Sequence, residues 1–203
     1  MMPHGPDRFR QRGASLIVSL LMLIVVLLLG ISAAQMALQG EKAERNDRDR
    51  KIAFQAAEAG LMDAELDIEN APGASRSGMF APDSRLGFTD GCGAGTGNVN
   101  LGLCNPAAEG ATPVWQAVDF LDASDNARSV PYGHFTGQSF QTSQGSLPAR
   151  LPRYIIEIMT YNKPGEDAGR NNRTYFYRIT AIGFGMRDST QVVLQTFYRK
   201  EAG

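Results

Sequence analysis

Hydrophobic residues are concentrated in one long run near the start of the chain. From Ala14 to Gly40 no charged residue occurs, and leucine, isoleucine and valine fill every side of a helix drawn through this run. A bilayer core needs roughly 20 helical residues, whereas the apolar part of a secretory signal peptide has about 7 to 15. A soluble helix that is apolar all round would have to be a central core helix. The run therefore predicts a membrane-spanning helix over residues 14–40.

The helical pattern continues beyond this run. Residues 41–59 contain neither proline nor glycine, and the first strong stop signal is Asn70-Ala71-Pro72-Gly73. Apolar residues recur at spacings of three and four, which is typical of an amphipathic helix. We therefore predict a second helical segment over 41–70, continuous with the first. Its large residues that should pack on the rest of the fold are Phe54, Leu61 and Ile68.

Acidic and basic residues alternate at the start of this second segment, over residues 41–51. Glu41 and Glu44 are each followed four residues later by an arginine, the favourable order for an ion pair along a helix. Asp47 and Asp49 are two residues apart and so point to different sides, which prevents them from sharing a cation. The pattern predicts a solvent-facing, ion-paired surface and no metal site.

Residues 71–150 are rich in Gly, Pro, Ser, Asn and Asp, which indicates an irregular, loop-rich region with brief regular pieces near 114–118. Its glycine-rich stretch GCGAGTGNVNLGLC lacks the spacing of a nucleotide-binding loop. The chain's two cysteines, Cys92 and Cys104, flank this stretch. In an oxidising compartment they would form a disulfide, and in the cytosol they would be two free thiols.

Alternating apolar and polar residues return in the last part of the chain, over 154–161, 175–183 and 191–198. The connections are short and turn-rich, so neighbouring strands should be antiparallel. A three-stranded meander with one apolar face needs a cover, and the long helix is the only long candidate. We predict an α+β fold in which a long N-terminal helix packs on an antiparallel sheet formed within 151–203.

The remaining composition excludes several classes of function. The net charge of −1 over 203 residues does not favour nucleic acid as a partner. Only His134 could act as a base outside the N-terminal tail, and a dyad with Cys92 or Cys104 is the single catalytic arrangement available. Because no GxSxG, HExxH or P-loop motif occurs, we expect no enzyme, no cofactor and no metal.

Charges flanking the apolar run leave its orientation open. Basic residues lie on both sides, three in residues 8–12 and five in residues 42–51, so the positive-inside rule does not favour a cytoplasmic N-terminus. The short, acid-poor N-terminal tail and the distal cysteine pair favour a cytoplasmic N-terminus.

Four stretches of the chain form a recognisable set. They are RxxGASLIVSLL at the start, NDRDRKIAFQAAEAGLMDAE in the second helical segment, and YRITAIGFG followed by STQVVLQTFYRK near the end. Together these motifs resemble the PilX family of type IV pilus minor pilins. The resemblance covers residues 11–69 specifically and the last thirty residues more loosely. It implies a type IV pilin-like fold and a leader, residues 1–13, that prepilin peptidase removes after Gly13. The resemblance implies that Ala14 would then be the new N-terminus and that its amine would be methylated. The leader would be cytoplasmic and the C-terminal domain periplasmic, in a single-pass inner-membrane protein that later enters the pilus at the cell surface.

The same resemblance suggests a role in assembly. Similar pilins usually carry a glutamate five residues into the mature chain, where this sequence has Val18. A buried amine without a carboxylate partner is costly. A subunit that lacks the glutamate therefore suits the first position, at the pilus tip. There the protein would help to start assembly and support motility and adhesion. The residues assigned to the assembly surface are Leu16, Val18, Leu20 and Leu21.

Expected partners are other minor pilins, the major pilin, the inner-membrane assembly platform, prepilin peptidase and a tip adhesin. Two alternatives stay open: a minor pseudopilin of a type II secretion system, and a membrane-anchored periplasmic binding module.

Overall fold

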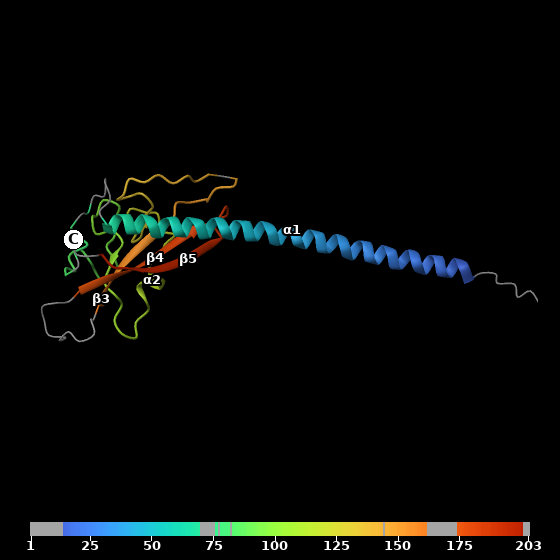
Figure 1. The fold of residues 1–203 in the computed structure, drawn as a ribbon, viewed down its shortest axis with the longest axis horizontal. Helices are drawn as coiled ribbons and strands as arrows, with labels where there is room; N and C mark the ends of the chain where they lie inside the picture. The colour runs from blue at the N-terminus through green and yellow to red at the C-terminus, as the bar shows by residue number, and fades with distance from the viewer. Residues whose placement is uncertain are drawn as a thin grey trace, which may run out of the picture. The chain divides into compact units, whose positions relative to one another are not determined.

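The structure is a computed structural model that describes residues 14–69, 76, 78–81, 83–143, 145–161 and 174–200. The chain divides into two compact units, one ending at Asn46 and one beginning at Asp47. The long helix α1 contributes residues to both units. The elements are α1 (Ala14–Glu69), β1 (Leu103–Cys104), α2 (Val114–Ala117), β2 (Val130–Pro131), β3 (Arg153–Tyr161), β4 (Thr174–Phe184) and β5 (Gln191–Tyr198). Figure 1 labels α1, α2 and the three long strands β3, β4 and β5. The predicted α+β fold is confirmed.

The second unit is built on one sheet with the strand order β1-β3-β4-β5. The three long strands form the antiparallel meander expected from their alternation, with Ile156 paired to Ile179 and Ala181 paired to Leu194. Two short strands join it: β1 runs parallel to β3, and β2 runs antiparallel to β3. Neither of these two strands could be predicted from the sequence, because a two-residue strand is too short to show an alternating pattern.

Small residues allow the second half of α1 to lie very close to the sheet. A Cβ atom added to Gly183 of β4 would lie 2.1 Å from the carbonyl oxygen of Ala53 and 2.2 Å from the amide nitrogen of Ala57. Both distances are far below van der Waals contact. The helix backbone thus rests directly on the strand, which requires glycine on one side and alanine on the other.

The large helix residues expected to make this contact behave differently from one another. Ile68 is completely buried in the main core, and Leu61 packs against that core while partly exposed. The prediction for Phe54 is wrong, because its side chain is 43% exposed. The buried face of α1 is formed largely by small residues such as Ala53. Phe54 points away from that face, because successive residues are about 100° apart around a helix.

Both faces of the sheet are covered. On one face, residues of α1 and the Phe80 and Phe88 rings pack on β3 and β4, with Phe88 stacked on Tyr177 at 5.9 Å. On the other, the loop-rich region supplies a second layer that contacts Ile155 of β3. Its buried residues are Cys92, Cys104, Val114, Val118 and Phe120, and they also pack on Ile182 and Phe184 of β4. Residues 71–150 therefore form half of the core as well as connecting its elements.

Candidate functional site: the apolar helix and a pocket beside the disulfide

The first part of α1 presents apolar side chains to its surroundings on every side. The four residues assigned to assembly are all more than half exposed, and helical geometry distributes them around the axis rather than on one face. This part of the helix is long and apolar enough to cross a membrane. Two of its hydroxyl groups donate back to the helix, from Ser19 to Leu16 and from Ser32 to Leu28. The side chains of these two serines therefore carry no unpaired donor into an apolar environment.

The predicted processing site lies at the edge of the described structure. Ala14 is the first residue of α1, and Gly13 falls outside the described residues. Cleavage after Gly13 and methylation of Ala14 stay predictions.

Three buried aspartates on the second part of α1 anchor three separate segments of the second unit. Asp49 accepts hydrogen bonds from the β4–β5 turn, including Arg187 Nε at 2.9 Å and Thr190 Oγ1 at 2.6 Å. Asp63 accepts from the Gly133 amide at 2.8 Å and from the Thr136 hydroxyl. All three aspartates are fully excluded from solvent.

The third of these aspartates has the most extensive contacts. Asp67 accepts from Arg76 Nε at 2.9 Å and from the Tyr154 hydroxyl at 3.0 Å. The Arg76 guanidinium also donates to the Leu101 carbonyl at 2.6 Å and lies 3.8 Å from the centre of the Phe135 ring. Asp67 therefore ties the end of α1 to the loop-rich region and to β3.

The roles of Asp49, Asp63 and Asp67 as anchors were not predicted from the sequence. The solvent-facing interpretation of residues 41–51 is confirmed for Glu41, which pairs with Arg45 at 2.5 Å, but it is wrong for Asp49. An acidic residue after other charged residues gives no local sign of burial. The available signal was that Asp49, Asp63 and Asp67 continue the three-and-four spacing of the small buried residues Ala53, Ala56, Gly60 and Ala64.

Burial and hydrogen bonding together raise the pKa of Asp63 and lower the pKa of Asp49. Burial raises the pKa of Asp63, and the hydrogen bonds from Thr136 and Gly133 offset this only in part. Burial also opposes ionisation of Asp49, but hydrogen bonds from Thr190, Arg187 and the Met186 amide outweigh it, so the pKa of Asp49 is lowered. Asp49 is thus stabilised as a carboxylate, whereas ionised Asp63 is held at a cost.

Cys92 and Cys104 form a disulfide within the layer on the far side of the sheet. Neither sulfur is therefore available as a thiol nucleophile, and His134 instead packs edge-on against Phe135 at 4.5 Å. Among the residues that the structure describes, no group of three or more His, Cys, Asp or Glu side chains is placed to hold a metal ion.

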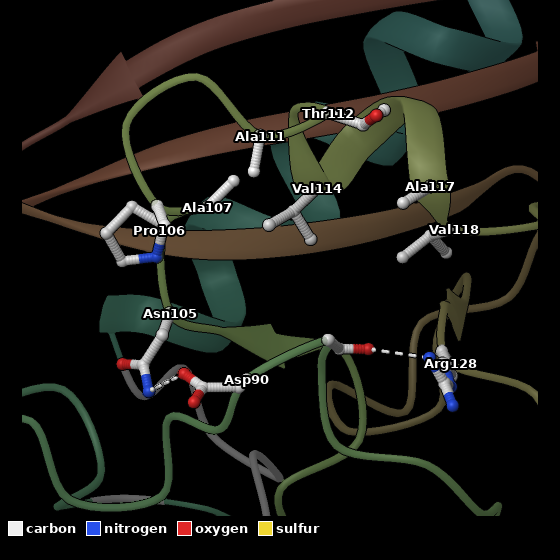
Figure 2. A pocket seen from close by; sticks show the side chains of 12 residues that line it. Asp90, Asn105, Pro106, Ala107, Ala111, Thr112, Val114, Ala117, Val118 and Arg128 are labelled. Carbon is white, nitrogen blue, oxygen red and sulfur yellow. Dashed lines mark hydrogen bonds between the residues drawn. The ribbon is translucent and has the colours of Figure 1, made fainter.

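A pocket of about 450 Å³ lies beside the disulfide. Its lining includes the residues that directly precede Cys92 and those that directly follow Cys104. Figure 2 shows its apolar wall, formed by Pro106, Ala107, Ala111, Val114, Ala117 and Val118. At its rim, Asn105 Nδ2 donates to Asp90 at 2.9 Å and Arg128 donates to the Gly91 carbonyl at 3.3 Å. The pocket thus has an apolar wall and, at its rim, polar side chains held by hydrogen bonds, an arrangement that suits contact with an apolar group.

Two family models match the chain. The PilX N-terminal model matches residues 12–61, and the model described as the C-terminal part of type IV pilus assembly protein PilX matches residues 100–200. The chain belongs to the PilX family. Comparison with curated proteins and with solved structures gave no match.

Membership of the PilX family identifies the chain as a type IV pilus minor pilin, a structural component that interacts with other pilus components. The apolar first part of α1 fits the single-pass membrane anchor of a pilin. The two PilX matches leave residues 62–99 between them. That interval contains Asp63, Asp67, Arg76 and Cys92, so much of the anchoring network lies between the matched regions.

Proposed function

We propose that this PilX-family pilin helps to start pilus assembly and occupies a position at or near the pilus tip, where it supports pilus biogenesis, twitching motility and adhesion. The observation that carries the proposal is the charge-free segment from Ala14 to Gly40, with Val18 where similar pilins usually carry glutamate. A helix that is apolar on every side leaves lipid readily when a bundle of equally apolar helices receives it.

The missing carboxylate is what favours an end position. Inside a helical bundle, a charged N-terminal amine needs a compensating group, because an unpaired buried charge is strongly unfavourable. Val18 cannot supply one to a neighbouring subunit. A subunit without the acid is therefore best placed first, where no subunit lies ahead of it.

The proposed topology places the leader in the cytoplasm and the second unit in the periplasm until the protein enters the pilus. The disulfide supports this orientation, because such bonds persist in oxidising compartments. The proposed partners are prepilin peptidase, the inner-membrane assembly platform, other minor pilins, the major pilin and a tip adhesin.

Processing is tested by sequencing the first residues of the protein purified from membranes and from sheared filaments. We expect a chain that begins at Ala14 with a methylated amine. A chain that still begins at Met1 and is absent from sheared filaments and from their initiating complex would contradict the proposal.

Deletion of the protein should abolish twitching and surface pili, and loss of secreted enzymes instead would indicate a secretion machine.

Position is tested with Val18→Glu, and Val18→Ala is the matched control that changes the side chain without adding an acid. We expect V18A to behave as wild type, and V18E to leave function little changed or impaired, with the protein still confined to filament ends in immunogold images. Even distribution of V18E along the fibre with full activity would show that the absent acid does not set the position.

A further inference from the structure

Another pocket, of about 350 Å³, borders the core layer on the face of the sheet away from α1. Two of its lining residues, Phe120 and Phe184, are buried members of that layer. Two leucines that also line it, Leu121 and Leu151, are 46% and 38% exposed. The pocket therefore combines a buried aromatic surface with apolar side chains that are open to solvent.

Backbone hydrogen bonds hold the chain on both sides of Leu151. The Ala149 amide donates to the Gly185 carbonyl at 2.8 Å, and the Tyr132 amide donates to the Pro152 carbonyl at 2.9 Å. This wall of the pocket is thus fixed before any ligand arrives, which lowers the cost of binding.

Arg153, the first residue of β3, lines the same pocket and is only partly bonded. Its Nε donates to the Ser129 hydroxyl and its Nη2 donates to the Ser129 carbonyl, both at 2.8 Å. A guanidinium has five N–H donors, and among the residues that the structure describes no acceptor is found for the others. Because arginine stays charged in proteins, the pocket holds a cation with free hydrogen-bond donors.

The acidic residues near Arg153 do not satisfy these donors. Burial lowers the pKa of Arg153, and the charges of Asp122 and Asp119 oppose that effect. Each of these carboxylates is bonded within its own loop, since Asp119 accepts from the Leu121 amide and Asp122 accepts from the Ser124 amide, both at 2.8 Å. Their charges would repel a doubly charged anion more than a singly charged one. The site therefore suits an anion with a single charge.

The second arginine at the pocket already has a counter-charge. Arg150 pairs with Asp188 at 2.8 Å, and its guanidinium lies 6.0 Å from the centre of the Phe184 ring. Arg153 is consequently the cation that remains available to a ligand.

We propose that this pocket binds a small carboxylate carrying one apolar group, with the carboxylate at the Arg153 guanidinium and the apolar group against Phe120 and Phe184. The planar guanidinium matches the geometry of a carboxylate. The volume holds about 12 non-hydrogen atoms, at the roughly 30 Å³ that a water molecule occupies in the liquid. N-acetyl-leucine has this size. The same chemistry occurs at the end of a polypeptide whose last residue is apolar and in a free short-chain carboxylate.

The test titrates the full chain, without other pilus proteins, in detergent micelles and follows its amide chemical shifts. With N-acetyl-leucine we expect saturable shifts at Leu121, Leu151 and Arg153 and a Kd in the millimolar range, as is usual for so small a ligand. The neutral N-acetyl-leucinamide has the same apolar group and nearly the same size. It should bind about tenfold more weakly, because hydrogen bonds between charged groups are stronger than those to neutral ones.

Isocaproate distinguishes the two sources of the ligand. It keeps the carboxylate and the isobutyl group of N-acetyl-leucine and lacks the peptide group. Tighter binding of N-acetyl-leucine would identify a polypeptide terminus as the ligand, and tighter binding of isocaproate would identify a free carboxylate.

Two substitutions test the role of the cation. Arg153→Gln should weaken the binding of N-acetyl-leucine about tenfold. Arg128→Gln is the matched control, because Arg128 also donates to a backbone carbonyl but lies outside this pocket, and it should leave binding unchanged.

A second pair of variants keeps the bonds between Arg153 and Ser129 intact. Leu151→Asp adds a negative charge to the pocket lining at a partly exposed position and should weaken N-acetyl-leucine several-fold more than the amide. Leu86→Asp makes the same exchange at an exposed leucine outside the lining and should change neither affinity.

Four results would overturn the proposal. They are the absence of saturable shifts with N-acetyl-leucine, equal affinity for the amide, equal weakening by Arg153→Gln and Arg128→Gln, and unchanged binding in Leu151→Asp. If Arg153→Gln does not fold, the comparison of Leu151→Asp with Leu86→Asp decides the question.

Discussion

Asp67 of α1 and Arg76 form an ion pair in which both side chains are completely excluded from solvent. The Asp67 carboxylate also accepts a hydrogen bond from the Tyr154 hydroxyl, and the Arg76 guanidinium donates one to the Leu101 carbonyl. Because most polar groups of the pair are satisfied, the cost of burying two charges is offset by hydrogen bonds in a region of low dielectric constant. The pair fastens the last turn of α1 to the part of the loop-rich region that lies on the same side of the sheet, at Leu101 and Phe135.

Removing one partner of this pair should destabilise the fold strongly. We expect Arg76→Met to lower the free energy of unfolding by about 3–5 kcal/mol, because it leaves Asp67 buried without its counter-charge. Urea unfolding of the full chain in detergent, followed by the fluorescence of Trp115, the single tryptophan, measures the change. The control is Asp188→Ala, which removes the exposed pair with Arg150 and should cost less than about 1 kcal/mol. Similar losses in the two variants would contradict this account of the buried pair.

Asp63 and Asp49 should give opposite dependences of stability on pH. The pKa of Asp63 is raised in the folded state, so the folded protein binds this proton more tightly than the unfolded chain does. Its ionised form therefore opposes folding at neutral pH. The unfolding free energy of the wild type relative to Asp63→Asn should rise as the pH falls from 7 toward 3.8, the ordinary value.

Asp49→Asn is the control for that measurement. The pKa of Asp49 is lowered in the folded state, so its contribution to stability is fully present above the ordinary value and is lost as the pH falls through the folded pKa. The difference between the wild type and D49N should stay constant from pH 7 to about 5 and shrink below 3.8. A parallel pH dependence in the two comparisons would refute the assignment.

Contact between α1 and β4 should not tolerate one added methyl group. In Gly183→Ala the new Cβ meets backbone atoms of Ala53 and Ala57, which cannot move without shifting the helix. We expect the free energy of unfolding to fall by about 1–3 kcal/mol or more, since 1–3 kcal/mol is the usual cost of overpacking a core. Gly97→Ala is the matched substitution, since nothing lies within 4 Å of its added Cβ. Thermal unfolding followed by circular dichroism distinguishes them, and equal midpoints would mean that the close contact is not required.

Loss of the disulfide should weaken the layer that covers the second face of the sheet. Replacing Cys92 and Cys104 together by serine opens a loop with a sequence separation of 12, which corresponds to about 3 kcal/mol in the chain-entropy model. A reducing agent should lower the stability of the wild type by a similar amount and leave the double variant unchanged. If reduction has no effect on wild-type unfolding in urea, the bond does not contribute to stability in this way.

Much of the fold follows from local patterns. The apolar run, the absence of helix breakers before residue 70, and three stretches of alternation were enough to predict a long helix and a meander. The sequence did not reveal β1, β2 or the second core layer, because these depend on partners distant in the chain. Phe54 illustrates the limit, since periodicity placed it on the packing face and the close fit of small residues put it outside.

By itself, the sequence determined the segments whose behaviour depends on their own residues: an apolar helix that needs an apolar environment, and strands with one apolar face. Only the tertiary structure decided which aspartates are buried, where the helix touches the sheet, and which edge of β5 is left open. A side chain's burial and its hydrogen-bond partners are set by residues far away in the chain. An acidic residue of the same helix can therefore be a solvated surface group, as Glu41 is, or a buried anchor, as Asp49 is.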